Sequence, residues 1–337
     1  MKAVQIIKPG EVKLIELPEP KPQFGEVLIR NRFVSLCGSD LNTYLGRNPL
    51  VKFPVIPGHE ISGVIEELGE GVPEHIEEGS SCTVIPYTNC GCCHACRNRR
   101  PNACQYNQTL GVQRDGGLCE YIVAPWQKVI VDDDMGYREL ALVEPLSVGF
   151  HAVERAKVID NEIVMVIGCG VVGVGAILRS LQRGAIVVAV DVEPYKLSYV
   201  HRLGAQFDIN TRSEDINALM QKIAPNGVDV VIEAAGRPET YRMAIEHVAF
   251  TGRVVYISYA SEEVSFATKD FVMKELDIRG SRNALPEDFH AVIKCMMRRG
   301  REWHTLAGTL YSIVSVKDAL ENWKNKPGKV FRPMIMF

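Results

Sequence analysis

Short apolar runs at close spacing dominate the first part of the chain, up to about residue 142. Turn-forming Gly, Pro, Asn and Asp residues interrupt nearly every gap between these runs. Closely spaced short strands separated by turns are typical of an all-β barrel or sandwich. We therefore predict a mainly β domain with strands at residues 3–7, 12–17, 26–36, 61–68, 82–87, 118–125 and 128–131.

The pattern changes after Pro145, where apolar strand candidates alternate with helical stretches. Strand alternating with helix over about 130 residues predicts a doubly wound parallel sheet. The predicted strands are 164–170, 187–191, 207–210, 228–236, 253–258 and 276–280, and the predicted helices are 172–184, 194–204, 216–224, 239–249 and 268–275. Beyond Gly280 we expect helices around 287–300 and 316–323 and a last strand at 329–337.

Six strands already complete a nucleotide-binding sheet by Gly280, so we expect the remaining segment to return to the first domain. The predicted domains are residues 1–147 with 281–337, and residues 148–280. Two domains also agree with a length of 337 residues.

The composition of the chain limits which binding partners and which cellular compartment we expect. The chain is 46% apolar and 23% charged, and its formal net charge of -3 includes no long basic tract. Nucleic acid and membrane surfaces are therefore not expected partners. The start of the chain lacks a secretory pattern, and the apolar run 163–178 is shorter than the ~20 residues of a membrane span. We expect a cytoplasmic protein whose ten cysteines are reduced.

Five cysteines crowd into residues 89–104. Cys90, Cys93, Cys96 and Cys104 have the spacing C-x2-C-x2-C-x7-C, which predicts a closed structural zinc site. Buried free thiols and an iron–sulfur cluster are the alternatives, but the polar residues between the cysteines and the long final gap favour zinc. We expect Cys92 to point away from the metal.

A second metal site is indicated by Cys37, His59, Glu60 and Glu144, each placed at the end of a predicted strand. A thiolate, an imidazole and carboxylate oxygens form a catalytic zinc set with a position left for substrate oxygen. A lone Cys or His more often packs than binds metal. Their joint occurrence, each beside Gly or Pro, favours the metal site.

A dinucleotide site is predicted by the G-x-G-x-x-G pattern that follows the strand candidate at 164–167 and opens a helix. Asp191 ends the next strand, where its carboxylate would accept hydrogen bonds from both ribose hydroxyls and repel a 2′-phosphate, so NAD is favoured over NADP. The alternative for Asp191 is a solvated strand-end carboxylate. The predicted cofactor residues are Gly168, Gly170, Val171, Val172, Gly173, Asp191 and Lys196.

Taken in order, CGSD, GHExxG, the four-cysteine lobe, VEPLSVG and GCGVVG make the whole chain resemble the zinc-dependent medium-chain dehydrogenases. The resemblance implies a GroES-like catalytic domain split around a Rossmann domain, an active site in the cleft between them, and a homodimer or homotetramer. Glu144 stands where dehydrogenases that act on simple alcohols usually have a third cysteine ligand. In this respect the chain is more similar to the polyol, threonine and sugar-acid branch of the family. In that branch Glu60 is an adjunct ligand that often reaches zinc through water.

The chain departs from the family in two places. Asn42 replaces a His that serves in the proton relay of many polyol dehydrogenases, and an amide does not titrate. The segment 79–82 reads GSSC where the family has a Gly-Asp-x-Val turn. The predicted substrate residues are Asn42, Tyr44 and Arg282.

The predicted reaction is a reversible NAD-linked oxidation of a secondary alcohol, in which zinc acidifies the substrate hydroxyl and the nicotinamide accepts hydride. Two zinc ions per chain are expected. Ser39 is the candidate that passes the proton outward, although its hydroxyl could equally cap the following turn.

Arg282 suits a carboxylate, because a guanidinium can donate two parallel hydrogen bonds, so a sugar acid is favoured over a neutral polyol. The segments CGSD, GRNP and GSR also resemble bacterial dehydrogenases that oxidise hexonates, which implies a substrate such as L-galactonate. The alternatives are a sorbitol- or xylitol-type polyol or L-threonine as substrate, with Arg282 bracing the domain junction or the cofactor.

Two other classes of protein fit these motifs less well. A non-enzymatic dinucleotide sensor, with a zinc lobe that contacts nucleic acid, is disfavoured because it needs no open zinc and because the net charge is negative. A zinc-free quinone or enone reductase would have no use for Cys37, His59 and Glu144 together.

Overall fold

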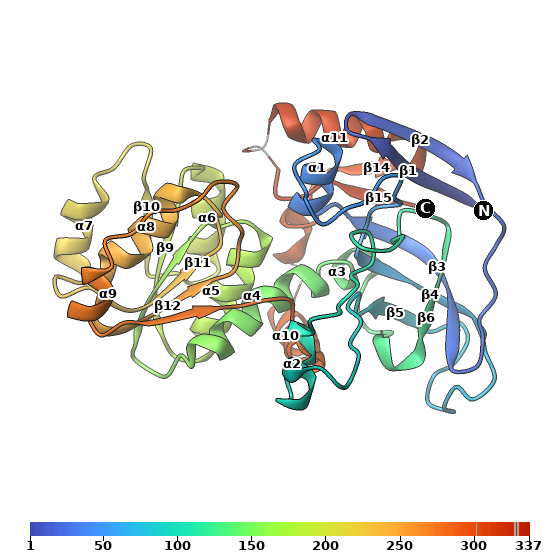
Figure 1. Ribbon diagram of the computed structural model, residues 1–337, viewed down its shortest axis with the longest axis horizontal. Helices are drawn as coiled ribbons and strands as arrows, with labels where there is room; N and C mark the ends of the chain where they lie inside the picture. Colours follow the sequence, from blue (N-terminus) through green and yellow to red (C-terminus); the bar gives the residue numbers. More distant parts are fainter. Residues whose placement is uncertain (301, 327, 329) are drawn as a thin grey trace. The chain divides into compact units, whose positions relative to one another are not determined.

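The structure is a computed structural model that describes residues 1–300, 302–326, 328 and 330–337 (Figure 1). The chain forms two compact units, one of Met1–Glu144 with Ile293–Phe337 and one of Pro145–Val292. The domain boundaries predicted after residues 147 and 280 stay predictions. The mainly β unit and the α/β unit together confirm the predicted fold class.

The first unit contains a two-stranded and a seven-stranded sheet. The hairpin pairs β1 with β2, and the larger sheet has the order β14-β15-β3-β4-β5-β7, with β6 paired to β3. Its strands are β1 (Lys2–Lys8), β2 (Glu11–Glu16), β3 (Glu26–Ser35), β4 (Glu60–Leu68), β5 (Ser81–Val84), β6 (Tyr121–Pro125), β7 (Val129–Val131), β14 (Leu310–Ser312) and β15 (Met334–Met336).

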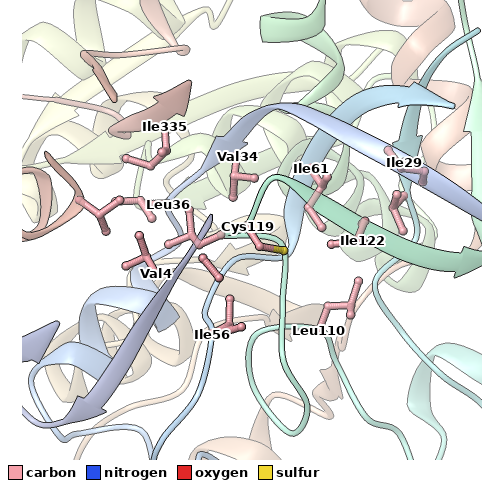
Figure 2. Packing of buried hydrophobic residues seen from close by; sticks show 14 of the residues in the cluster. Val4, Ile29, Val34, Leu36, Ile56, Ile61, Leu110, Cys119, Ile122 and Ile335 are labelled. Carbon is pink, nitrogen blue, oxygen red and sulfur yellow. The ribbon is translucent and has the colours of Figure 1, made fainter. Parts of the chain in front are cut away.

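Strand β3 is the centre of this sheet, since it pairs antiparallel with β4, β6 and β15. Apolar side chains from these strands and from the hairpin meet in one buried cluster (Figure 2). Cys119 lies within this cluster and is 3% exposed, so its thiol packs against apolar side chains. Burying these side chains stabilises the sheet by removing apolar surface from water.

The second unit is a six-stranded parallel sheet of order β10-β9-β8-β11-β12-β13. Parallel neighbours need crossovers, and a helix fills each gap between consecutive strands. The elements are β8 (Ile163–Ile167), α5 (Val171–Gln182), β9 (Ile186–Asp191), α6 (Pro194–Arg202), β10 (Phe207–Asn210), α7 (Ile216–Ile223), β11 (Val228–Glu233), α8 (Pro238–His247), β12 (Val248–Tyr256), α9 (Lys269–Met273) and β13 (Asp277–Gly280). The strand order reverses at β8, which lies between β9 and β11.

Helix α4 (Val143–Ala156) was not predicted, and Glu144 lies in its first turn rather than at the end of a strand. The sequence there has Pro145 and Gly149, which usually mark turns. Proline is tolerated in the first turn of a helix, where its missing N–H has no partner to lose. Gly149 allows close packing, because a Cβ there would lie 2.1 Å from the Val172 carbonyl oxygen on α5.

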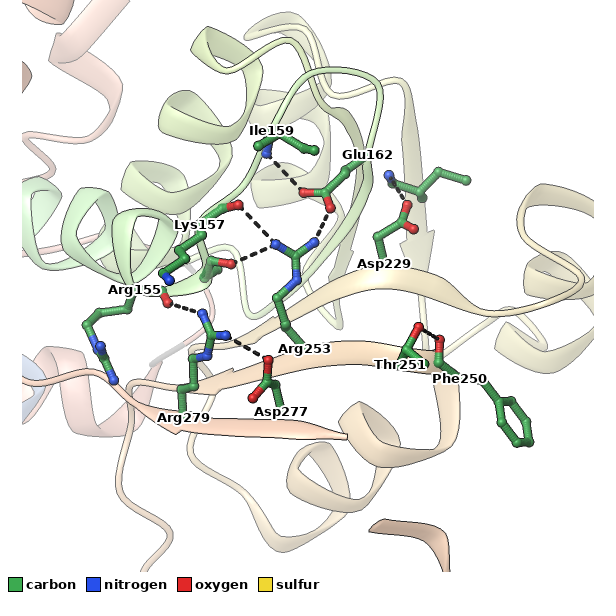
Figure 3. A network of polar contacts seen from close by, with 12 residues as sticks. Arg155, Lys157, Ile159, Glu162, Asp229, Phe250, Thr251, Arg253, Asp277 and Arg279 are labelled. Atoms are coloured by element: carbon green, nitrogen blue, oxygen red, sulfur yellow. Dashed lines mark hydrogen bonds and ion pairs between the residues drawn. The ribbon is translucent and has the colours of Figure 1, made fainter. Parts of the chain in front are cut away.

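Two arginines of the sheet bind the end of α4 (Figure 3). Arg253 of β12 donates to the Ala156 and Lys157 carbonyls at 2.9 Å each and pairs with Glu162. Arg279 of β13 donates to the Arg155 carbonyl at 2.8 Å. Cations satisfy the unpaired carbonyls at a helix C-terminus and favour its dipole.

The remaining elements are mostly short. They are α1 (Gly38–Tyr44), α2 (His94–Arg97), η1 (Pro101–Ala103), η2 (Trp126–Lys128), α3 (Tyr137–Leu140), α10 (Pro286–Arg299), η3 (Glu302–Thr305), η4 (Ile313–Ser315) and α11 (Val316–Asn325). The predicted last strand, 329–337, is confined to β15, and residue 329 lies outside the described part. No helix among the described residues has the length and apolar character to cross a membrane.

We expect Arg253→Ala to lower the free energy of unfolding by roughly 2–4 kcal/mol, because it removes the ion pair of the largely buried Glu162 and the donor of two carbonyls. Chemical denaturation would measure the loss. Arg237→Ala is the control, since Arg237 pairs with Glu239 at the surface with 73% of its side chain exposed. Equal stability of the two variants would contradict the structural role of Arg253.

Candidate active site and metal centres

Strand register brings the first group of candidate ligands together. In the sheet Ser35, the last residue of β3, pairs with Glu60, the first residue of β4. Cys37 lies two residues beyond Ser35, and His59 directly precedes Glu60. The ligand atoms of Cys37, His59 and Glu60 consequently lie within 4.8 Å of one another.

Asp40 fixes the two turns that carry Cys37 and His59. Its Oδ2 accepts the Cys37 backbone N–H at 2.8 Å, and its Oδ1 accepts the Gly58 N–H at 3.2 Å. Gly58 has φ +98°, and a Cβ there would lie 2.9 Å from Val34, so the turn before His59 requires glycine. The Asp40 carboxylate also lies 4.0 Å from His59 Nδ1.

A third strand adds a cation to this group. Met334 of β15 pairs with Ser35, and the Leu36 N–H donates to the Pro333 carbonyl at 2.9 Å. This pairing places the buried Arg332 guanidinium against Glu60, to which it donates a hydrogen bond. One carboxylate oxygen of Glu60 is therefore held by a positive charge.

Glu144 lies outside the group formed by Cys37, His59 and Glu60. Its carboxyl is 4% exposed and accepts a hydrogen bond from the Tyr87 hydroxyl. Electrostatic effects of both His59 and Cys37 reach it, so it faces the same cluster. The structure thus brings three predicted ligands together directly and leaves the fourth beside them.

Burial and neighbouring charges shift the ionisation of the cluster. Burial raises the pKa of the Glu144 carboxyl to about 7 and that of Asp40 to about 6. Burial by itself would lower the pKa of His59, but the Cys37 thiolate beside it raises this pKa to about 10. Burial would raise the pKa of the Cys37 thiol, yet Arg332 and His59 hold it well below its ordinary range.

The donors fit a zinc ion. The carboxyls of Asp40, Glu60 and Glu144 are buried near a half-buried thiol, and among the described residues Arg332 brings a permanent positive charge to this group. A divalent cation supplies the positive charge that so many buried acidic groups require. Thiolate, imidazole and carboxylate are the ligands of catalytic zinc, which keeps one position for substrate.

The four-cysteine lobe also has the geometry of a metal site. The Sγ atoms of Cys90, Cys93, Cys96 and Cys104 lie within 4.8 Å of one another. Cys93 Sγ is 3.6 Å from Cys96 Sγ and 3.8 Å from Cys104 Sγ. Tetrahedral zinc with bonds of about 2.3 Å places its sulfurs roughly 3.8 Å apart.

Backbone amides favour thiolates in this lobe. The Cys93 N–H donates to Cys90 Sγ at 3.3 Å, and the amides of Cys92 and Cys93 lower the pKa of the Cys90 thiol. The fifth cysteine, Cys92, is exposed and lies outside the group of four, with its Sγ 3.7 Å from that of Cys90.

The glycine loop in the second unit has the shape that a dinucleotide needs. Gly168 has φ +94°, and a Cβ on Gly173 would lie 1.8 Å from the Gly168 carbonyl oxygen, so the first glycine makes the turn and the third packs helix on strand. A Cβ on Gly170 would meet nothing within 4 Å, which leaves the backbone open to a ligand. The loop follows β8, where the strand order reverses, and α5 begins at Val171. An anion is favoured at such a helix start.

The other cofactor candidates surround this loop. Asp191 Oδ2 accepts the Cys169 N–H at 2.7 Å, and Oδ1 accepts the N–H groups of Val192 and Glu193 at 2.7 and 2.9 Å. Its carboxylate is therefore oriented by the loop itself. Lys196, half-buried in α6, acts electrostatically on Cys169, and Val172 follows the buried Val171 at the helix start.

The remaining candidates lie in different surroundings. The Ser39 hydroxyl is buried in α1 and acts on Cys37, although burial, Arg332 and His59 influence the pKa of that thiol more. Asn42 is exposed on the same helix. The Tyr44 hydroxyl is engaged with Glu321 of α11, so it is not directed at the cluster around Cys37. Arg282, half-buried, follows β13 at the carboxyl edge of the parallel sheet.

Sequence reasoning missed Asp40, Tyr87 and Arg332. For Asp40 a signal existed, because Cys37-x-x-Asp40 has the spacing of a capping box, which the structure forms. For the other two no local signal was present. Their roles depend on segments that are 57 and 272 residues from their partners.

Comparison with known proteins places the chain in a family. Residues 23–133 match the family model of the alcohol dehydrogenase GroES-like domain, and residues 171–298 match that of zinc-binding dehydrogenase. The chain is 32% identical to L-galactonate-5-dehydrogenase of Escherichia coli (strain K12), covering 86% of this chain and 85% of that protein. It is 32% identical to sorbitol dehydrogenase of Bacillus subtilis (strain 168), covering 98% and 96%.

A crystal structure of an alcohol dehydrogenase from E. coli CFT073, complexed with NADH, shares the fold. It has a TM-score of 0.90 and 26% identity, and the match covers 100% of this chain and 99% of that one. The chain therefore belongs to the zinc-type alcohol dehydrogenases of the medium-chain family, which confirms the resemblance. It is an oxidoreductase that acts on CH–OH donors with zinc and a nicotinamide dinucleotide.

We expect Cys104→Ser to remove one zinc equivalent and to lower the thermal stability, because a structural site needs all four thiolates. Metal analysis and thermal unfolding would measure both. Cys92→Ser is the matched control in the same loop and should keep the full zinc content. Loss of zinc from the Cys92 variant alone would show that the ligand set is wrong.

Proposed function

We propose that this protein is an NAD-dependent dehydrogenase that oxidises a secondary alcohol of a sugar acid, with a hexonate such as L-galactonate as the substrate class. The observation that carries the reaction is the cluster of Cys37, His59 and Glu60 beside Glu144, within a fold that has an open glycine loop. We further propose two zinc ions per chain, a cytoplasmic location and a homo-oligomer, a dimer or tetramer.

Glu144, with Cys37 and His59, is proposed to hold the catalytic zinc. When bound, zinc makes the substrate hydroxyl more acidic, and the nicotinamide accepts hydride. Glu144 fits the third ligand better than Glu60, because the Tyr87 hydroxyl that donates to it is neutral and brings no competing positive charge. Glu60 is already partly neutralised by Arg332, in agreement with an adjunct role.

Proton release is proposed to pass through Ser39. Its hydroxyl is buried beside Cys37 and can both accept and donate a proton. Asn42, three residues further along the same helix, cannot replace a titrating relay residue because an amide does not ionise in this range. Asp40 keeps the turns that carry Cys37 and His59 in place, because it accepts the backbone N–H groups of Cys37 and Gly58.

The substrate class is supported by Arg282 and by the relative that carries the name L-galactonate-5-dehydrogenase. Arg282 follows β13 at the carboxyl edge of the sheet, on which the glycine loop also lies. Ligands of open α/β sheets bind at this edge. A guanidinium there suits the carboxylate of a hexonate.

A neutral polyol is the second candidate, since sorbitol dehydrogenase of Bacillus subtilis matches the chain over nearly its full length. A panel of hexonates, sorbitol, xylitol and L-threonine, each at about 1 mM with NAD, separates the candidates by initial rate. We expect a hexonate to give the highest kcat/KM. A higher kcat/KM for sorbitol or xylitol would show that the substrate class is a polyol and not a sugar acid.

Cofactor choice gives one prediction. The unaltered enzyme should have a kcat/KM for NAD at least tenfold above that for NADP, because the Asp191 carboxylate repels a 2′-phosphate. Asp191→Asn keeps an acceptor for the loop amides and removes the charge, so it should narrow this ratio. Asp208→Asn, an acidic residue of β10 paired with His201, is the control and should leave the ratio unchanged. Equal use of both cofactors by the unaltered enzyme would contradict the role of Asp191.

Arg282 gives another prediction. Arg282→Ala should lower kcat/KM for a hexonate by roughly 10²-fold, because a charge-assisted hydrogen bond is lost, and should hardly change that for sorbitol. Arg282→Lys should recover part of the loss, since it keeps the charge and loses the bidentate geometry. NADH affinity, followed by fluorescence, is the control. A weakened NADH affinity with equal losses for both substrates would assign Arg282 to the cofactor.

A further inference from the structure

Tyr87 links the two candidate metal sites of the first unit. It lies between the end of β5 and Cys90, the first cysteine of the lobe, and is 5% exposed. Its hydroxyl donates to Glu144 Oε1, and Glu144 is 4% exposed. Only Thr88 and Asn89 separate this tyrosine from a lobe ligand.

Hydrogen bonds hold the segment that carries Tyr87 on two sides. On the lobe side, the Leu110 N–H donates to the Pro86 carbonyl at 3.0 Å, and the Gln108 N–H donates to the Thr88 hydroxyl at 2.7 Å. On the sheet side, Lys128 Nζ donates to the Asn89 side chain at 3.0 Å. The chain that leaves the lobe therefore holds the residues on both sides of Tyr87.

The contact with Glu144 is suited to orienting a metal ligand. A phenol is a single directional donor, and a buried aromatic ring has few alternative rotamers. Because the phenol is neutral, it stabilises the carboxylate without cancelling its charge.

We propose that Tyr87 is a positioning residue that couples the four-cysteine lobe to the catalytic metal site, because it fixes the Glu144 carboxylate from the base of the lobe. The proposal rests on the proposed function in one respect, the assignment of Glu144 as a ligand. It gives the lobe a second role besides local stability: an intact lobe keeps Tyr87, and through it Glu144, in place.

Tyr87→Phe tests the contact, since it removes one hydroxyl and keeps the ring. Zinc release from the loaded enzyme to the coloured chelator 4-(2-pyridylazo)resorcinol gives the readout. Zinc should leave the two sites in separate kinetic phases. Cys37→Ala lacks the catalytic site, so the phase that is missing in this variant is the release of catalytic zinc. We expect Tyr87→Phe to release catalytic zinc at least tenfold faster while the lobe phase is unchanged, as is typical when an outer partner of a metal ligand is lost.

Tyr44→Phe is the matched control, because it also deletes a buried phenol that donates to a glutamate, here Glu321, in the same unit. It should leave the catalytic release rate unchanged. An unchanged rate in Tyr87→Phe, or an equal increase in both variants, would overturn the proposal. If the unaltered enzyme and Cys37→Ala release zinc in the same phases, the enzyme has no zinc at Cys37 and the proposed function itself fails. This outcome differs from the ones that overturn only the role of Tyr87.

Coupling through Tyr87 is tested by a double-variant cycle with Cys104→Ser. In the Tyr87 background, loss of the lobe should accelerate catalytic zinc release, and in the Tyr87→Phe background it should add little. Cys96→Ser serves in the same cycle if the Cys104 variant does not fold. Additive effects in both backgrounds would show that the lobe acts on the catalytic site by another route.

Discussion

The register of three strand ends determines the chemistry of the first unit. Ser35 of β3 pairs with Glu60 of β4 and with Met334 of β15, so the residues next to these pairs are forced into one small volume. Cys37, His59 and Arg332 come from segments far apart in the chain, and they meet because backbone hydrogen bonds fix the offset of each strand. A shift of one residue in either pairing would turn every side chain to the opposite face and separate the candidate ligands.

This arrangement concentrates acidic groups below the surface, and the electrostatic behaviour of the site follows from it. Without a metal, raised pKa values at Asp40 and Glu144 and the pairing of Cys37 with His59 reduce the repulsion. A divalent ion achieves the same balance while leaving the thiolate and carboxylates charged. Glu60 and Glu144 have donors of different charge, a guanidinium and a phenol.

The sequence predicted those features whose signal is local. The alternation of strand and helix in residues 163–280 and the glycine spacing at 168–173 are read from neighbouring residues, and the structure contains both. The four-cysteine group was also predictable, because its members span only residues 90–104 and a short loop can hardly keep them apart. Helix α4 was missed because a proline in its first turn and a glycine packed on α5 have the same appearance in sequence as a turn.

Other features depend on the tertiary structure alone. The sequence determined that Cys37, His59, Glu60 and Glu144 are present beside turns, but it did not determine that Glu144 lies in a helix outside the group of three. Nor did it determine that the Tyr44 hydroxyl is engaged with Glu321, 277 residues away, or that Tyr87 holds Glu144. The physical reason is that residue type and spacing specify local backbone conformation, whereas contacts between distant segments are set by strand register and by the packing of helices on the sheet.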